Sequence, residues 1–153
     1  MNLFGLMATS GSAMQAERVR AEVVAVNMAN AETTRTEEGG PYRRKMVVFA
    51  AEGSAPDFLR SLRDAAGTGR GTQGSVTPGV HIAAVVEDPS PPLKRYDPGH
   101  PDAGPDGYVS YPDINPVTEM VDLMGATRAY GLNGSAVQAE KGMITAALEI
   151  AKS

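Results

Sequence analysis

The chain has 153 residues, the length of one domain or of one domain with appendages, and it carries a net charge of −4 without any cysteine. The absence of cysteine excludes a disulfide framework, thiolate zinc sites, iron–sulfur clusters and a cysteine nucleophile, and the acidic balance argues against a nucleic-acid-binding surface. Leu, Ile, Val and Phe together make up just under a fifth of the residues, a level at which a self-sufficient core becomes doubtful. The composition therefore predicts a thin core and apolar surface that a partner has to cover.

The N-terminal segment resembles neither a cleaved export signal nor a membrane anchor. Its first 16 residues contain no charged side chain, whereas a secretory signal begins with a basic region. No run in the chain approaches the ~18 consecutive apolar residues that a membrane-spanning helix needs. We expect a soluble protein, or one that is exported by a route that removes no peptide.

The 11 prolines divide the chain, because all of them lie between Pro41 and Pro116. Proline breaks helices, so we expect two long terminal helices, over residues 3–29 and 117–151, around a non-helical middle. The predicted fold class is α+β, with the terminal helices paired as an α-helical coiled-coil domain beside a small β-rich middle domain. The coiled-coil assembly domain is expected to comprise residues 1–34 and 115–153, and the middle domain residues 35–114.

The first predicted helix carries an apolar stripe at heptad spacing. Met7, Met14, Ala21 and Met28 lie seven residues apart, a spacing that places side chains along one seam of a coiled coil. Its only charged residues lie between positions 17 and 22, whereas a helix with one side in water normally has a charged outer face. We therefore expect neighbours on several sides of this helix; an ordinary amphipathic core helix is the alternative.

Several strands and turns are predicted between the helices. The β-branched runs at residues 42–51 and 80–87 read as strands, and shorter strands are expected at 93–96 and 108–111. Residues 57–66 suit a short helix, and the Gly/Thr/Ser-rich residues 67–79 suit a mobile loop. The proline-rich residues 88–92 and 97–107 are expected to form turns.

The last predicted helix has a clear start. Asn115 is a favourable N-cap, Pro116 suits the first helical position, and Glu119 and Asp122 lie near the positive end of the helix dipole. Four glycines weaken this helix by up to about 1 kcal/mol each relative to alanine, so it should fray in isolation. The same glycines permit the close approach of a neighbouring helix.

The apolar stripes of both helices make up the predicted assembly interface. Asn27 and Asn30, at the end of the first helix, are added because their amides can bond free backbone groups of their own turn or of a neighbour. The full predicted set is Leu3, Leu6, Met7, Met14, Val24, Asn27, Asn30, Leu123, Tyr130, Val137, Ile144 and Leu148.

A glycine pattern in the middle of the chain does not indicate a nucleotide site. Gly69, Gly71 and Gly74 match GxGxxG, but a dinucleotide fingerprint follows a strand and opens a helix. Here the pattern follows a helix-like stretch and meets Pro78 four residues later. No GxSxG nucleophile pattern is present either, so we expect neither a bound nucleotide nor a serine nucleophile.

One loop holds a cluster of potential metal ligands. Asp97, His100, Asp102 and Asp106 offer one imidazole and three carboxylates within ten residues. Their spacing matches neither a calcium-binding EF-hand loop nor a zinc-protease helix, and aspartate is a common turn former. A surface turn is therefore the favoured interpretation, with no metal and no cofactor, and His81 stands alone in a strand.

The only basic run is Arg43, Arg44 and Lys45. It offers charge to an anionic surface, although the acidic total and the strand context favour a solvated or interface face. Glu87 and Asp88 are candidates to pair with this run across a sheet.

Several long runs resemble bacterial flagellar axial proteins. Residues 27–31 (NMANA), followed by Thr33 and Thr34, resemble the signature that ends the N-terminal helix of that family. Residues 34–45 (TRTEEGGPYRRK), 86–92 (VEDPSPP), 96–103 (YDPGHPDA) and 107–123 (GYVSYPDINPVTEMVDL) resemble the proximal rod protein family FlgC. The resemblance covers both termini and most of the middle, and it departs around residues 53–79.

The resemblance implies a structural, non-enzymatic subunit of the flagellar basal-body rod, which would transmit torque across the periplasm. It implies export by the flagellar type III apparatus without signal cleavage, and self-association in a helical assembly. Implied partners are the rod proteins FlgB, FlgF and FlgG and a FliE-type adaptor, with no nucleic acid and no membrane span.

Three alternatives remain open from the sequence. The chain could be a different rod subunit of the same architecture, of the FlgB type. It could instead be a stand-alone binding module whose helices pair with each other alone. The third alternative is a metal-dependent hydrolase built on Asp97, His100 and Asp102.

Overall fold

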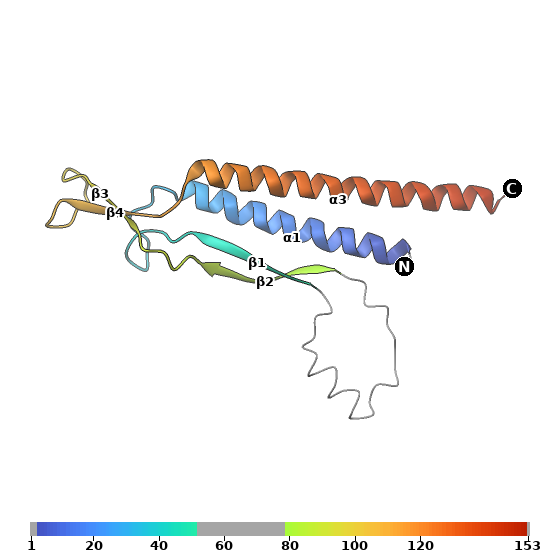
Figure 1. Ribbon diagram of the computed structural model, residues 1–153, viewed down its shortest axis with the longest axis horizontal. Helices are drawn as coiled ribbons and strands as arrows, with labels where there is room; N and C mark the ends of the chain where they lie inside the picture. Colours follow the sequence, from blue (N-terminus) through green and yellow to red (C-terminus); the bar gives the residue numbers. More distant parts are fainter. Residues whose placement is uncertain (1–2, 52–78, 153) are drawn as a thin grey trace, which may run out of the picture. The chain divides into compact units, whose positions relative to one another are not determined.

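The computed structural model describes residues 3–51 and 79–152; for Leu3 it describes the backbone alone (Figure 1). The elements follow in the order α1 (Leu3–Ala29), β1 (Lys45–Ala51), β2 (Val80–Glu87), β3 (Leu93–Tyr96), β4 (Tyr108–Tyr111) and α3 (Pro116–Ile150). The predicted α+β class is confirmed. The expected short helix at 57–66, the GxGxxG pattern and nearly all of the expected loop at 67–79 lie outside the described residues.

The chain divides into two compact units. Unit 1 comprises Met1–Ala16, Phe49–Ala83 and Ala129–Ser153, and unit 2 comprises Glu17–Val48 and Ala84–Arg128. Each unit therefore contains part of both helices. The domain boundaries predicted above follow the helices instead, and they stay a prediction.

The start of α3 and the end of α1 are each explained by a local hydrogen bond of an asparagine side chain. The N-cap prediction for α3 is confirmed, because Asn115 Oδ1 accepts a hydrogen bond from the backbone N–H of Val117 at 2.9 Å. The Asn115 carbonyl accepts the first helical bond from Glu119. At the end of α1, the side-chain amide of Asn30 donates to the Val26 carbonyl at 2.9 Å and occupies one of the terminal acceptors.

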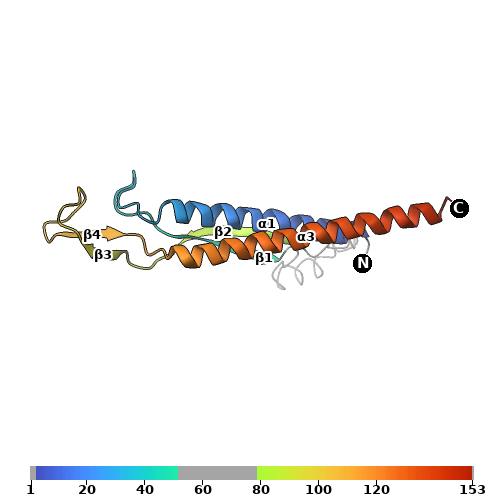
Figure 2. The same ribbon diagram turned by 90° about the horizontal axis from the view of Figure 1, so that it is seen from above.

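The two helices lie beside each other within each unit (Figures 1 and 2). In unit 2 they run antiparallel, since Asn27 contacts Glu119 while the earlier Arg20 contacts the later Asp122. In unit 1, a Cβ added to Gly134 would lie 3.9 Å from the sulfur of Met14. The pairing therefore contains close contacts, and its coiled-coil form stays a prediction.

Among residues 3–51 and 79–152, the buried apolar residues are few and mostly small. They are Ala16, Val24, Val109, Ile114 and Ala126. The prediction of a thin core agrees with this set, which holds no large aromatic side chain. None of the described helices is long and apolar enough to cross a membrane.

The strands form two separate two-stranded sheets, β1 with β2 and β3 with β4. The second pair is antiparallel, with Leu93 opposite Tyr111 and Tyr96 opposite Tyr108. The strand predicted at 42–51 begins later, at Lys45. The reason is that the backbone N–H of Tyr42 donates to the Thr33 carbonyl, so this stretch is held by the segment after α1.

Candidate functional site: a buried polar network

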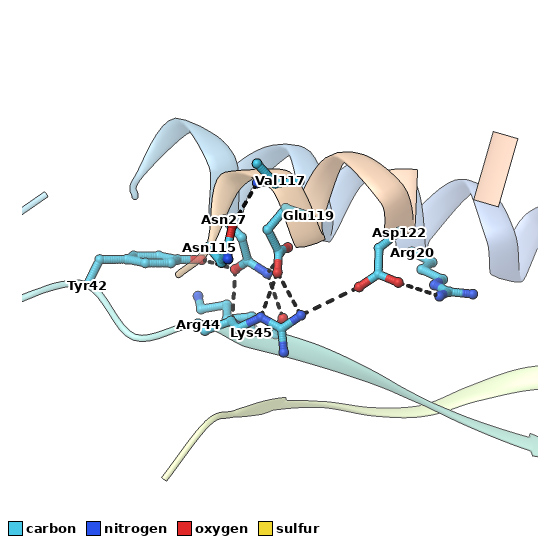
Figure 3. Close-up of polar contacts among 9 residues, drawn as sticks. All are labelled: Arg20, Asn27, Tyr42, Arg44, Lys45, Asn115, Val117, Glu119 and Asp122. Carbon is cyan, nitrogen blue, oxygen red and sulfur yellow. Dashed lines mark hydrogen bonds and ion pairs between the residues drawn. The ribbon is translucent and has the colours of Figure 1, made fainter. Parts of the chain in front are cut away.

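A network of polar side chains joins the end of α1, the start of β1 and the first turns of α3 within unit 2 (Figure 3). We call it the junction network; its members are Arg20, Asn27, Tyr42, Arg44, Lys45, Glu119 and Asp122. They come from α1, from residues 42–45 at the start of β1 and from α3, and no sequence motif connects these three segments.

Asn27 is the centre of the junction network and is only 1% exposed. Its Oδ1 accepts hydrogen bonds from the backbone N–H of Lys45 at 2.9 Å and from the Tyr42 hydroxyl at 3.1 Å. Its Nδ2 donates to the Lys45 carbonyl at 2.8 Å and to Glu119 at 3.0 Å. All four hydrogen-bonding positions of the amide are thus used. The Asn27 side chain bonds both the N–H and the C=O of Lys45, as the backbone of a neighbouring strand would.

Glu119 supplies the buried charge of the junction network and is also 1% exposed. Its Oε1 accepts from the Arg44 guanidinium at 2.6 Å, and its Oε2 accepts from Asn27. A buried carboxylate is tolerated when it is both paired and hydrogen-bonded. Glu119 therefore has specific partners, Arg44 and Asn27, in addition to its position near the positive end of the helix dipole.

The charges continue from Glu119 in alternating sign. Arg44 also lies 3.6 Å from Asp122 Oδ2, and Asp122 Oδ1 lies 3.2 Å from the Arg20 guanidinium. Arg44 is largely covered, whereas Arg20 and Asp122 are about one-third exposed. The contribution of the outer pair is reduced by solvent screening, so the inner pair dominates the network.

Burial is the main cause that raises the pKa of Tyr42 above its ordinary value near 10.0, with smaller contributions from the negative charges of Glu87 and Glu119. The phenol therefore remains a neutral hydrogen-bond donor to Asn27 throughout the physiological range.

The candidate pairing of the basic run with Glu87 and Asp88 occurs between Arg44 and Asp88 through the backbone, but the carboxylate partners of Arg44 are Glu119 and Asp122. Asp88 meets Arg44 through the backbone, where its N–H donates to the Arg44 carbonyl at 2.8 Å. Hydrogen bonds from Ser90 are the main cause that lowers the pKa of Asp88, and Arg44 is a minor one. Arg43 is exposed, as expected for a solvated face, whereas Arg44 points into the junction network.

The candidate metal ligands perform other tasks. The carboxylate of Asp102 accepts from Thr34 at 2.8 Å and lies 3.7 Å from Arg35, and its backbone N–H donates to His100 Nδ1 at 3.1 Å. Asp106 accepts from the N–H of Tyr108. Across residues 3–51 and 79–152, no three such side chains converge on a possible metal position.

Comparison with known proteins identifies the family. The family described as "Flagellar basal body rod FlgEFG protein C-terminal" matches residues 106–150, which include β4 and α3. The flagellar basal-body rod protein FlgC of Bacillus subtilis is 42% identical over 156 residues, covering 99% of this chain and all of that protein. The chain belongs to the FlgC family. FlgC of Borreliella burgdorferi and of Salmonella typhimurium are 37% and 35% identical, each comparison covering 98% of both chains.

The residues predicted as the FlgC-type assembly interface differ in how far they are covered. Those at least partly covered within the described chain are Met7, Met14, Val24, Leu123, Val137 and Ile144; those exposed are Leu6, Tyr130 and Leu148. Asn27 belongs to the junction network, and Asn30 bonds its own turn. Leu3 lies in α1, and only its backbone is among the parts that the structure describes. Their role as an interface stays a prediction.

The FlgC-family chain also has an exposed apolar surface that the heptad analysis missed. It lies on α3 in unit 2 and consists of Val117, Met120, Val121 and Met124, which are 69%, 53%, 58% and 64% exposed. We call it the α3 stripe. Its i, i+3, i+4, i+7 spacing is the signal that could have identified it. The heptad positions of Leu123, Tyr130 and Val137 lie on another face of the helix.

Proposed function

We propose that this chain is a structural, non-enzymatic subunit of the rod in the bacterial flagellar basal body, and that it polymerises through its terminal helices. The observation that carries the proposal is its near-full-length similarity to FlgC relatives that are named as basal-body rod proteins. The exposed apolar residues of both helices support it, because a stable monomer rarely leaves so much apolar helix surface uncovered.

The junction network suits a part that bears mechanical load. It connects both helices to the first residue of β1 through a buried charge pair and a fully bonded amide. Sliding one helix along the other would leave Glu119 buried without its partners, which is costly. We therefore assign the network the task of keeping α1, α3 and β1 in one register while torque passes through the subunit.

The remaining parts of the proposal concern location and partners. The rod would lie in the periplasm, reached through the flagellar type III export apparatus without signal cleavage. Neighbours in the assembly would be further copies of this chain, the rod proteins FlgB, FlgF and FlgG, and a FliE-type adaptor. No catalytic step, cofactor or metal is part of this function.

The decisive experiment is the isolation of basal bodies from a strain that carries an epitope-tagged copy of the chain in place of its own gene. We expect the tag in the purified rod fraction and loss of motility when the gene is deleted. A matched tagged cytoplasmic protein should be absent from the fraction. Normal rods and motility in the deletion strain would contradict the proposal.

A specific test of the helices uses Met14→Glu and Val137→Asp. Each should prevent rod assembly and motility while the β3–β4 hairpin stays folded, because a charge then enters a partly covered helix face. Lys141→Glu is the control, since Lys141 is an exposed charge on the same helix. A motile double variant with normal rods would refute the assembly role.

A further inference from the structure

Asp102, in the loop between β3 and β4, is bonded to the segment that follows α1. The Thr34 hydroxyl donates to Asp102 Oδ2 at 2.8 Å, and the Arg35 guanidinium lies 3.7 Å from Asp102 Oδ1. We call these two interactions the loop contact. All three residues line a groove of about 610 Å³ within unit 2. The loop contact therefore joins two walls of this groove that lie 68 residues apart in the chain.

The position of Asp102 depends on the protonation state of His100. The backbone N–H of Asp102 donates to His100 Nδ1 at 3.1 Å. A ring nitrogen accepts a hydrogen bond only when it carries no proton, and both nitrogens of a charged imidazole are donors. The ring that makes this bond is therefore neutral, with its proton on Nε2.

The ionisable groups around His100 are two carboxylates, two guanidinium groups and one phenol. They belong to Asp97, Asp102, Arg35, Arg95 and Tyr111. The Tyr111 ring lies 6.2 Å from the imidazole, and the Arg95 guanidinium lies 4.7 Å from the centre of the same tyrosine ring. Positive and negative groups are equal in number, so the hydrogen bond from Asp102 is the interaction that distinguishes a neutral ring from a charged one.

We propose that His100 makes the loop contact sensitive to pH: the contact forms while the imidazole is neutral and is released when the imidazole takes up a proton. Protonation places an N–H at Nδ1 opposite the N–H of Asp102, so their hydrogen bond is lost. The positive ring also attracts the Asp102 carboxylate away from Thr34 and Arg35. Histidine ordinarily changes charge between about pH 5 and 8, so modest acidification releases the contact.

The turn at residues 34–41 keeps its own hydrogen bonds when the loop contact is released. Its backbone bonds run from Thr36 to Gly40 and, at its base, from Tyr42 to Thr33. The turn therefore moves without unfolding, and the width of the groove changes. The junction network stays intact over the same range, because carboxylates ordinarily take up protons only near about pH 4.

Nuclear magnetic resonance of the imidazole nitrogens in the full-length chain tests the state of the ring. At about pH 8, where histidine is ordinarily neutral, His100 should carry its proton on Nε2 and none on Nδ1. His81, which is exposed in β2, is the internal reference. A proton on Nδ1 of His100 at this pH would overturn the proposal.

His100→Asn is the matched variant for the loop contact. An asparagine side chain also accepts a hydrogen bond from the backbone two residues further on, but it does not titrate. Relaxation dispersion of the backbone amides in residues 34–41 measures the population in which the contact is open. On acidification from about pH 8 to 5.5, this population should rise about fivefold in the parent chain, the ratio expected for one hydrogen bond. It should stay constant in His100→Asn, whereas His81→Asn should behave as the parent chain does.

Three results would overturn the pH-sensitive contact. They are equal opening in the parent chain and in His100→Asn, no opening in the parent chain at the lower pH, and opening that extends to the amides around Asn27. The first would assign the release to a group other than His100, and the third would show general unfolding.

A measurement on the parent chain decides the matter where circular dichroism shows that His100→Asn does not fold. The amide signal of Asp102 and the ring signals of His100 should then change with the same midpoint pH, because one proton controls both. Two different midpoints would overturn the proposal.

Discussion

At the scale of single residues, the junction network shows how neighbouring residues of one type acquire different roles. Arg43 and Arg44 are adjacent in the sequence, yet Arg43 is exposed and Arg44 donates to a buried carboxylate. Asn27 and Asn30 likewise lie one helical turn apart. Asn27 is bonded to β1 and α3, whereas Asn30 bonds the end of its own helix.

The two arginines make a matched pair for a stability measurement. Arg44→Met leaves Glu119 buried without its cation, and removal of one partner from a buried pair typically costs about 3–5 kcal/mol. Arg43→Met should change the free energy of unfolding by less than about 0.5 kcal/mol, as surface substitutions usually do. Urea denaturation followed by circular dichroism measures both, and equal effects would contradict the assigned role of Arg44.

Tyr42 predicts a dependence of stability on alkaline pH. Its pKa is raised in the folded chain, so above the ordinary value near 10.0 the unfolded chain loses the phenol proton first. The stabilising contribution of Tyr42 is therefore complete below pH 10 and is lost as the pH rises through the folded-state pKa. The stability advantage of the parent chain over Tyr42→Phe should shrink above pH 10; a constant difference would exclude this role.

At the scale of elements, α3 combines a good start with an interior weakened by glycine. The Asn115 cap and Pro116 define its first turn, while its glycines lower the intrinsic helix stability. At three of them, Gly125, Gly131 and Gly142, an added methyl group would meet nothing within 4 Å. Packing within the chain does not require glycine at these three positions.

Gly131→Ala is therefore expected to stabilise the isolated chain, by up to about 1 kcal/mol. The contrasting variant is Gly107→Ala in the turn before β4. Gly107 has a φ of +76°, and a Cβ there would lie 2.8 Å from the Tyr96 ring, so this change should destabilise the chain. Thermal unfolding of both variants provides the comparison, and a loss of stability in Gly131→Ala would contradict the prediction.

At the scale of the whole molecule, the part of the chain that the structure describes, residues 3–51 and 79–152, has few buried apolar side chains. Those in this part are alanine, valine and isoleucine, while the α3 stripe and Phe4 are exposed. A chain with this distribution gains much of its apolar burial from other molecules. This is the expected property of a subunit that becomes fully ordered on assembly.

Hydrogen exchange of the isolated chain tests this property. Backbone amides in residues 3–16 of α1 should exchange rapidly, because exposed apolar turns with few buried contacts open easily. Amides near Asn27 should exchange more slowly, since the junction network holds that turn. Assembly into rods should slow the first group strongly; uniformly slow exchange over the whole of α1 in the monomer would refute the prediction.

The sequence alone determined the elements whose signals are local. The proline-free ends of the sequence located both long helices. The N-cap at Asn115 was confirmed because capping depends on residues two to four positions apart. Three of the four predicted strands, at Val80–Glu87, Leu93–Tyr96 and Tyr108–Tyr111, have the predicted bounds. Alternating and β-branched runs between turn residues are likewise signals of short range.

Tertiary structure alone decided which polar residues meet. Glu119 lies 75 residues from Arg44 and 92 from Asn27 along the chain, so no spacing rule connects them. A predicted sheet brings Glu87 and Asp88 near the basic run, yet the closest carboxylate partner of Arg44 is Glu119. The face of α3 that turns toward α1 was equally undetermined, because Leu123, Tyr130 and Val137 follow one face of the helix while the α3 stripe follows another. Burial of Glu119 against Arg44 and Asn27 settles that rotation in unit 2, and thereby exposes the α3 stripe.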